Sequence, residues 1–149
     1  MAYVLIGGLA ASLHGSPHVT TDVDITPSAE RGNLARLAGA LKDLDARIRA
    51  PGEPDGLPFD RSAATLARLS ILNLTTRHGD LDITFVPSGT AGFDDLRQRA
   101  IEITVHETRV VVAALADIVR SKEAAGREKD RLTLPTLRRL LEREGEGMQ

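Results

Sequence analysis

The sequence predicts a single domain of the α+β class, with a small mixed β-sheet flanked by helices. The chain has 149 residues, which is the usual length of one domain. Short segments with alternating apolar residues lie between segments in which apolar residues recur at helical spacing. Hydrophobic residues make up 42% of the chain and charged residues 27%, which excludes a disordered chain. We therefore expect one domain over residues 1–149, whose C-terminal helices begin at about residue 114.

Turn-forming residues divide the first part of the chain into two strands, two helices and a loop. Ser28 is the expected N-cap of the second helix, because apolar residues recur at helical spacing from Leu34 to Leu44. The segment 50–58 contains three prolines and two glycines, so we expect a loop there. The other expected elements are a strand over Tyr3–Ile6, a helix over Gly8–His14 that ends at Gly15, and a strand over Val19–Ile25 that ends at Pro27.

The second part of the chain continues with paired strands and ends in two helices. The letters RHGD at residues 77–80 are typical of a turn, which places Asp80 in the turn and Asp82 within the following strand. The expected elements are strands over Leu69–Thr75 and Leu81–Val86, a helix over Phe93–Ala100, a hairpin over Ile101–Val112, and helices over Ala114–Ala125 and Pro135–Glu144.

Composition excludes several classes of protein. No apolar run approaches the roughly 20 residues that a membrane helix needs, and the N-terminal letters MAYVLIGG lack the basic region of a signal peptide. The chain has no cysteine, which excludes disulfides and thiolate metal sites and is typical of a reducing cytoplasm. We therefore expect a cytoplasmic protein without a membrane partner.

The charge is distributed unevenly along the chain. The net charge of −2 predicts no strong overall attraction to nucleic acid, and aromatic residues, at 3%, are too few for base-stacking platforms. Residues 114–143 nevertheless contain eight basic and five acidic residues, a local excess of three positive charges. This excess indicates a surface that faces an anion.

Two aspartates stand one residue apart in a segment that otherwise resembles a buried strand. Side chains alternate between the faces of a strand, so Asp22 and Asp24 point the same way while Val23 and Ile25 point towards the core. Two carboxylates roughly 7 Å apart repel each other unless a cation lies between them. A hard cation such as Mg²⁺ would relieve the repulsion, because it prefers carboxylate and phosphate oxygens. The alternative is the solvated face of an edge strand.

Three further features favour the cation site. Asp82 repeats the pattern in the middle of a second strand, where an unpaired carboxylate is costly. Gly7 and Gly8 lie between a strand and a helix, where backbone N–H groups can approach a phosphate; the alternative is a tight turn. Lys122 supplies a cation on a closing helix; the alternative, for Lys122 taken alone, is a solvated helix face.

These residues resemble the signature of the DNA polymerase β-like nucleotidyltransferase superfamily: the letters IGG, a spacer of thirteen residues, then DVDI. The longer string YVLIGGLAASLHGSPHVTTDVDI resembles the minimal bacterial nucleotidyltransferases related to the AbiEii and MenT toxins. The letters LDITFV in the middle and the tail DIVRSKEAAGREKDRLTLPTLRRLLE resemble the same group. The chain departs from it in having His18 where relatives commonly carry arginine, and in beginning almost directly on the first strand.

The resemblance implies a polymerase β palm-like fold and a metal-dependent transfer reaction. Asp22 and Asp24 would hold two Mg²⁺ ions, with Mn²⁺ as a substitute. Asp82 would complete one metal site and help to deprotonate the attacking hydroxyl. The catalytic and metal-binding residues implied are therefore the same three carboxylates, and the metals would stabilise the transition state and the leaving pyrophosphate.

The resemblance also implies how the chain binds an NTP such as ATP. The backbone N–H groups of Gly7 and Gly8 would bind the β- and γ-phosphates. Lys122, Arg127 and Lys129 would neutralise the charge of the triphosphate, while Asp130 would orient a basic neighbour rather than bind metal.

The acceptor of the nucleotide is a separate question. About 35 residues follow the last expected strand, too few for a separate domain that would hold a small molecule. We therefore expect a macromolecular acceptor, foremost the 3′ end of tRNA, with the chain acting as a toxin that has a cognate antitoxin. The alternatives are an antitoxin-type enzyme that modifies a HEPN-domain partner protein, and an enzyme that modifies a small molecule such as an antibiotic.

Overall fold

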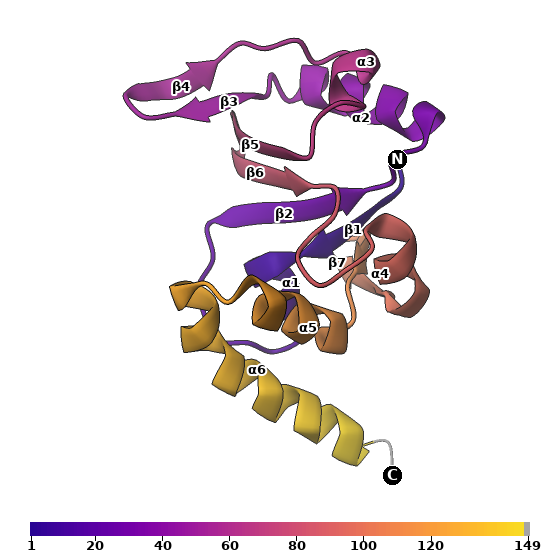
Figure 1. Cartoon of the computed structure of the whole chain (residues 1–149), viewed down its shortest axis with the longest axis vertical. Coiled ribbons are helices and arrows are strands. Elements are labelled where there is room, and N and C mark those ends of the chain that lie inside the picture. The colour runs from indigo at the N-terminus through magenta and orange to yellow at the C-terminus, as the bar shows by residue number, and fades with distance from the viewer. Residues whose placement is uncertain (148–149) are drawn as a thin grey trace.

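The computed structural model describes residues 1–147, and within them it contains eight strands and six helices (Figure 1). The strands are β1 (Tyr3–Ile6), β2 (Asp22–Pro27), β3 (Arg47–Ala50), β4 (Glu53–Leu57), β5 (Ile71–Thr76), β6 (Gly79–Thr84), β7 (Ile101–Val105) and β8 (Thr108–Val112). The helices are α1 (Gly7–Leu13), α2 (Arg31–Asp43), α3 (Ala63–Leu66), α4 (Phe93–Arg99), α5 (Leu115–Ala125) and α6 (Glu128–Gly147). None of the helices within these residues is both long and apolar enough to cross a membrane.

All eight strands of the described chain join one mixed sheet, in the order β4-β3-β5-β6-β2-β1-β8-β7. The pairs β2–β6 and β1–β8 are parallel, and the other neighbours are antiparallel. Figure 1 shows α2 and α3 beside the β3–β4 end of the sheet, and α1, α5 and α6 towards its other end. The α+β class and the mixed sheet with flanking helices are confirmed.

The core fixes which face of the central strands remains open. Leu34, Leu37 and Leu41 of α2 recur at helical spacing and are at most 4% exposed. Leu72 and Leu74 of β5 belong to the same buried cluster. Because strand side chains alternate, this burial turns the intervening residues of β5 and of its neighbours towards the opposite face.

The expected loop over 50–58 is wrong, because this segment contributes to a hairpin of β3 and β4 at the edge of the sheet. An edge strand tolerates Pro54, since its missing N–H faces away from the sheet. Gly56 adopts φ +73°, and a Cβ there would lie 2.8 Å from Cβ of Arg47. The prolines and glycines therefore mark an irregular edge strand rather than a loop.

The starts of two helices also differ from the prediction. Helix α2 has Glu30 as its N-cap, while Ser28 is buried and accepts a hydrogen bond from the Glu30 N–H at 3.3 Å. Helix α6 begins at Glu128 and contains Pro135 instead of starting there. Pro135 lies on the exposed side of the helix, where water can replace the hydrogen bond that proline does not donate.

Smaller differences concern strand ends and exposure. Strand β2 begins at Asp22 rather than Val19, and Asp80 lies in β6 rather than in the turn. Val23, expected in the core, is 37% exposed. The short helix α3 was not predicted. The strand β1, the helix α1, the helix α4, the β7–β8 hairpin and the helix α5 match their predictions to within one residue at each end.

Candidate active site

The carboxylates singled out in the sequence lie side by side on the two central strands. Strands β2 and β6 are parallel, and their register places Asp24 opposite Asp82 and Asp22 opposite Asp80. Asp22, Asp24 and Asp82 all line one cavity of about 850 Å³. The tertiary structure thus brings together carboxylates about 60 residues apart in the chain and adds Asp80 to the group.

Gly7 is required by its contact with Asp24. Its φ is +72°, and a Cβ built on it would overlap the Asp24 carboxylate. A Cβ on Gly8 would lie only 3.0 Å from the Thr20 side chain. Both glycines line the same cavity as the carboxylates, so they let the backbone approach this site closely.

The pKa of Asp24 is raised well above its usual value. Burial and, after it, the neighbouring charges of Asp82 and Asp22 together raise the pKa of Asp24 from 3.8 to about 6. Lys129 and Lys122 act in the opposite direction. Burial and the adjacent carboxylates therefore disfavour the charged form of Asp24 in the absence of a cation.

Arg49 is the residue that the sequence analysis missed. Its Nη2 donates hydrogen bonds to Oδ1 of Asp82 at 2.9 Å and to the carbonyl of Leu74 at 2.8 Å. Its Nε lies 3.3 Å from Oδ2 of Asp80. The letters RIRA alternate as a strand does and so indicate this strand, whereas the proline-rich segment beside them predicts a loop.

The donor set of the cavity fits Mg²⁺, which prefers carboxylate oxygens, and Gly7 keeps the space beside Asp24 open. Within residues 1–147, however, no three Asp, Glu or His side chains are already arranged to hold a metal ion. Arg49 occupies one oxygen of Asp82. A cation would have to share or displace this ion pair.

Three cationic side chains from α5, α6 and the turn between them also line the cavity. They are Lys122, Arg127 and Lys129, and the resemblance implies that they bind the triphosphate; His18 also lines the cavity. The fully buried Asp130 lies 3.4 Å from Nζ of Lys122 and accepts a hydrogen bond from Nε of Arg127 at 2.8 Å. Lys122 and the glycine pair therefore face one cavity, although more than 110 residues separate them.

Asp130 stays ionised beside Lys122 and Arg127. Its burial raises the pKa, but hydrogen bonds from Arg127 and the charge of Lys122 outweigh burial and hold the pKa below its usual value. A buried anion between two cations fixes their direction. Asp130 thus contacts the two basic neighbours that it is expected to orient.

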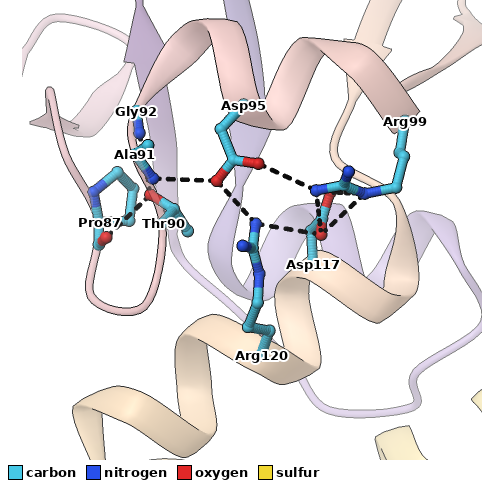
Figure 2. A network of polar contacts seen from close by, with 8 residues as sticks. All are labelled: Pro87, Thr90, Ala91, Gly92, Asp95, Arg99, Asp117 and Arg120. Carbon is cyan, nitrogen blue, oxygen red and sulfur yellow. Dashed lines mark hydrogen bonds and ion pairs between the residues drawn. The ribbon is translucent and has the colours of Figure 1, made fainter.

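A network of ion pairs supports the rim of the cavity (Figure 2). Arg99 donates to both oxygens of Asp117 and to Asp95, and Arg120 lies 2.9 Å from Asp95 and 3.2 Å from Asp117. The Ala91 N–H donates to Asp95 at 2.9 Å; this bond and the one from Arg120 lower the pKa of Asp95 to about 2. The network joins α4 and the segment 87–92 to α5.

Comparisons with known proteins give a consistent fold. The lincosamide antibiotic adenylyltransferase LnuA, solved with lincomycin bound, is similar with a TM-score of 0.56 and 15% identity, over 93% of this chain and 87% of LnuA. TM1012 of Thermotoga maritima, a candidate nucleotidyltransferase, is similar with a TM-score of 0.56 and 16% identity, over 95% of this chain and 83% of TM1012. No protein-family model and no curated protein sequence matches the chain. The chain has the nucleotidyltransferase fold.

Proposed function

We propose that this protein is a metal-dependent nucleotidyltransferase. It would transfer a nucleoside monophosphate from an NTP to a hydroxyl group. One observation carries the proposal. The Asp24–Asp82 register on β2 and β6 places paired carboxylates in the same cavity as Gly7, Gly8 and Lys122. Carboxylates suit a divalent cation, whereas glycine backbone and lysine suit a triphosphate, so the cavity combines the two chemistries that nucleotidyl transfer needs.

Each group has a distinct task in this proposal. Asp22, Asp24 and Asp82 would hold Mg²⁺, which supplies charge stabilisation at the transferred phosphate. Lys122, oriented by Asp130, would neutralise the pyrophosphate as it leaves, with Arg127 and Lys129 nearby. Asp82 would also accept the proton of the attacking hydroxyl, because a carboxylate beside that hydroxyl is a general base.

The acceptor we propose is the 3′ end of tRNA, with the chain acting as the toxin of a toxin–antitoxin pair. The resemblance to the AbiEii and MenT group and the basic C-terminal segment support it. Four of the eight basic residues there are in ion pairs with aspartate or glutamate, namely Arg120, Lys122, Arg127 and Arg138. The other four, Lys129, Arg131, Arg139 and Arg143, are exposed. Phosphate binding would depend on the exposed side chains outside the cavity, together with Arg138, whose ion pair with Glu123 is itself about half exposed.

A small-molecule acceptor is the second candidate, and the likeness to LnuA favours it. The chain covers 87% of LnuA, whose name gives a lincosamide antibiotic as its substrate. A domain of this length can therefore act on a small molecule without an additional domain, which weakens the argument from chain length. The cavity of about 850 Å³ lies within the size range of small-molecule sites.

One experiment separates these acceptors. The protein is incubated with each labelled NTP and Mg²⁺, in turn with total tRNA, with a co-expressed HEPN-domain partner protein, and with lincomycin. Label in tRNA that is absent with Asp24→Asn supports the toxin proposal. Label only in the partner protein supports an antitoxin-type enzyme, and label only in lincomycin supports the second candidate. Transfer that Asp24→Asn leaves unchanged overturns the proposal as a whole.

Lys122→Ala is expected to lower kcat by about 10- to 100-fold and to raise the KM for the NTP. The charge on the leaving pyrophosphate grows as its bond to the α-phosphate breaks, so the loss falls mainly on kcat. Initial rates at varied NTP concentration measure both constants. Lys42→Ala, on the exposed end of α2, is the matched control and should change neither. Unchanged kinetics in Lys122→Ala would show that Lys122 has only a structural role, in its ion pair with Asp130.

Reversing Arg138 and Arg139 to glutamate is expected to weaken tRNA modification and to flatten its salt dependence, because phosphate contacts are lost. NTP binding should not change, since neither residue lines the cavity. The same charge change at Arg97 and Arg109, on exposed parts of α4 and β8, is the control. Modification rates at several salt concentrations provide the measurement; equal loss in both double variants would exclude a specific basic surface.

A further inference from the structure

Arg49 belongs to the same row of side chains as the paired carboxylates. The register pairs Ile48 with Leu74, which places Arg49 opposite Asn73, and Asn73 in turn pairs with Asp82. Arg49, Asn73 and Asp82 all line the cavity. The row therefore runs from Arg49 on β3 across β5 and β6 to Asp24 on β2.

The position of Arg49 in this row indicates whether it lies near the acceptor hydroxyl or near the triphosphate. This step rests on the proposed function. Strand β1, which leads into Gly7, lies on the far side of β2 from β6. The triphosphate would thus lie beyond Asp24, next to Gly7 and Lys122. In an in-line displacement the attacking oxygen approaches opposite to the leaving oxygen. The acceptor hydroxyl therefore approaches over β6, β5 and β3, where Arg49 lies.

Arg49 differs from the other cations of the cavity in both place and bonding. Within residues 1–147, the other lysines and arginines that line the cavity are Lys122, Arg127 and Lys129, from α5, α6 and the turn between them. The Arg49 side chain is 34% exposed. Among the described residues its Nη1 donates no hydrogen bond, and its Nε makes none of good geometry despite lying 3.3 Å from Asp80.

We infer that Arg49 is the anion-binding residue on the acceptor side, and that it contacts the phosphodiester next to the attacking 3′ hydroxyl of a nucleic acid. In the free protein its charge balances Asp80 and Asp82. With a cation bound at Asp82, the Arg49 guanidinium would balance less of this negative charge and would be available to an anion. Guanidinium is permanently charged and binds phosphate through two parallel hydrogen bonds, which an ammonium group does not do.

The test uses a 5′-fluorescent RNA trinucleotide of sequence CCA that ends in a 3′-deoxyribose and cannot react. A second probe is identical except for a neutral methylphosphonate at its terminal linkage. Binding is measured by anisotropy with Mg²⁺ and a non-hydrolysable NTP analogue. The wild-type protein should bind the charged probe about 10-fold more tightly. This comparison needs no variant, so a folding defect does not affect it.

The variants then assign the preference to one residue. Arg49→Gln should bind both probes equally, and Arg49→Lys should retain only part of the preference. Arg47→Gln is the matched control, because Arg47 lies two residues earlier on the same face of β3 and does not line the cavity. It should keep the full preference.

Two results would overturn the inference: equal binding of both probes by the wild-type protein, or an undiminished preference in Arg49→Gln. Either can occur while the protein still transfers labelled nucleotide to some acceptor, in which case the proposed function stands and only the role of Arg49 fails. Transfer that is insensitive to Asp24→Asn would instead refute the proposed function, whatever the probes show.

Discussion

Asp24→Asn is expected to abolish nucleotidyl transfer, with a loss of about 10³-fold or more, and to make the metal-free protein more stable at pH 7. The two effects have one cause. The carboxylate of Asp24 lies next to Asp82 and Asp22, and this clustering suits a cation but repels in its absence. Asparagine keeps the shape of the side chain and removes the charge.

The gain in stability should depend on pH in a defined direction. The pKa of Asp24 is raised from 3.8 to about 6 in the folded state, so folding favours its protonated form. That contribution is complete below about pH 3.8 and is lost as the pH rises through 6. The variant should therefore exceed the wild type by an amount that grows from pH 4 to pH 7, reaching on the order of 1–3 kcal/mol for this partly open site.

Urea unfolding between pH 4 and pH 8, with and without Mg²⁺, measures these effects. Mg²⁺ should stabilise the wild-type protein more at pH 8 than at pH 5, because its ligands must be ionised, and should stabilise Asp24→Asn far less. Asp55→Asn, on the exposed edge strand β4, removes a carboxylate outside the cavity and should change neither activity nor the response to Mg²⁺. A less stable Asp24→Asn would contradict the charge argument and favour a structural role for this carboxylate.

Asp117→Asn is expected to destabilise the protein by about 2–4 kcal/mol, the second large effect. Asp117 is 4% exposed and lies within 3.2 Å of both Arg99 and Arg120. Asparagine in its place leaves two guanidinium groups facing one another with Asp95 as their remaining carboxylate (Figure 2). The expected loss of stability is smaller than that for breaking a fully buried ion pair, because both arginines are partly open to water.

Thermal unfolding should show this loss as a fall in Tm of roughly 10 °C. Glu123→Gln is the matched control, since Glu123 lies on the same helix and pairs with Arg138 at 3.2 Å, with both side chains about half exposed. An exposed pair contributes little, so the control should change the free energy of unfolding by no more than about 0.5 kcal/mol. Equal effects of the two substitutions would show that burial of Asp117 adds nothing to the network.

The sequence alone determined the fold class and most of the secondary structure. Helical spacing from Leu34 to Leu41 and strand alternation around Leu72 and Leu74 are local patterns, and the structure buries these residues. The same logic placed Asp22 and Asp24 on one face of a strand. It failed at residues 50–58, because a strand at the edge of a sheet accepts proline and glycine that a central strand does not.

The composition of the cavity was decided by the tertiary structure. Alternation along one strand cannot show that β2 pairs in parallel with β6, yet that pairing sets Asp24 opposite Asp82 and brings Asp80 beside Asp22. Arg49 reaches Asp82 only because β3 joins β5. The direction of a side chain follows from the alternation of residues along its own strand. Which strands pair with each other depends instead on how the whole core packs.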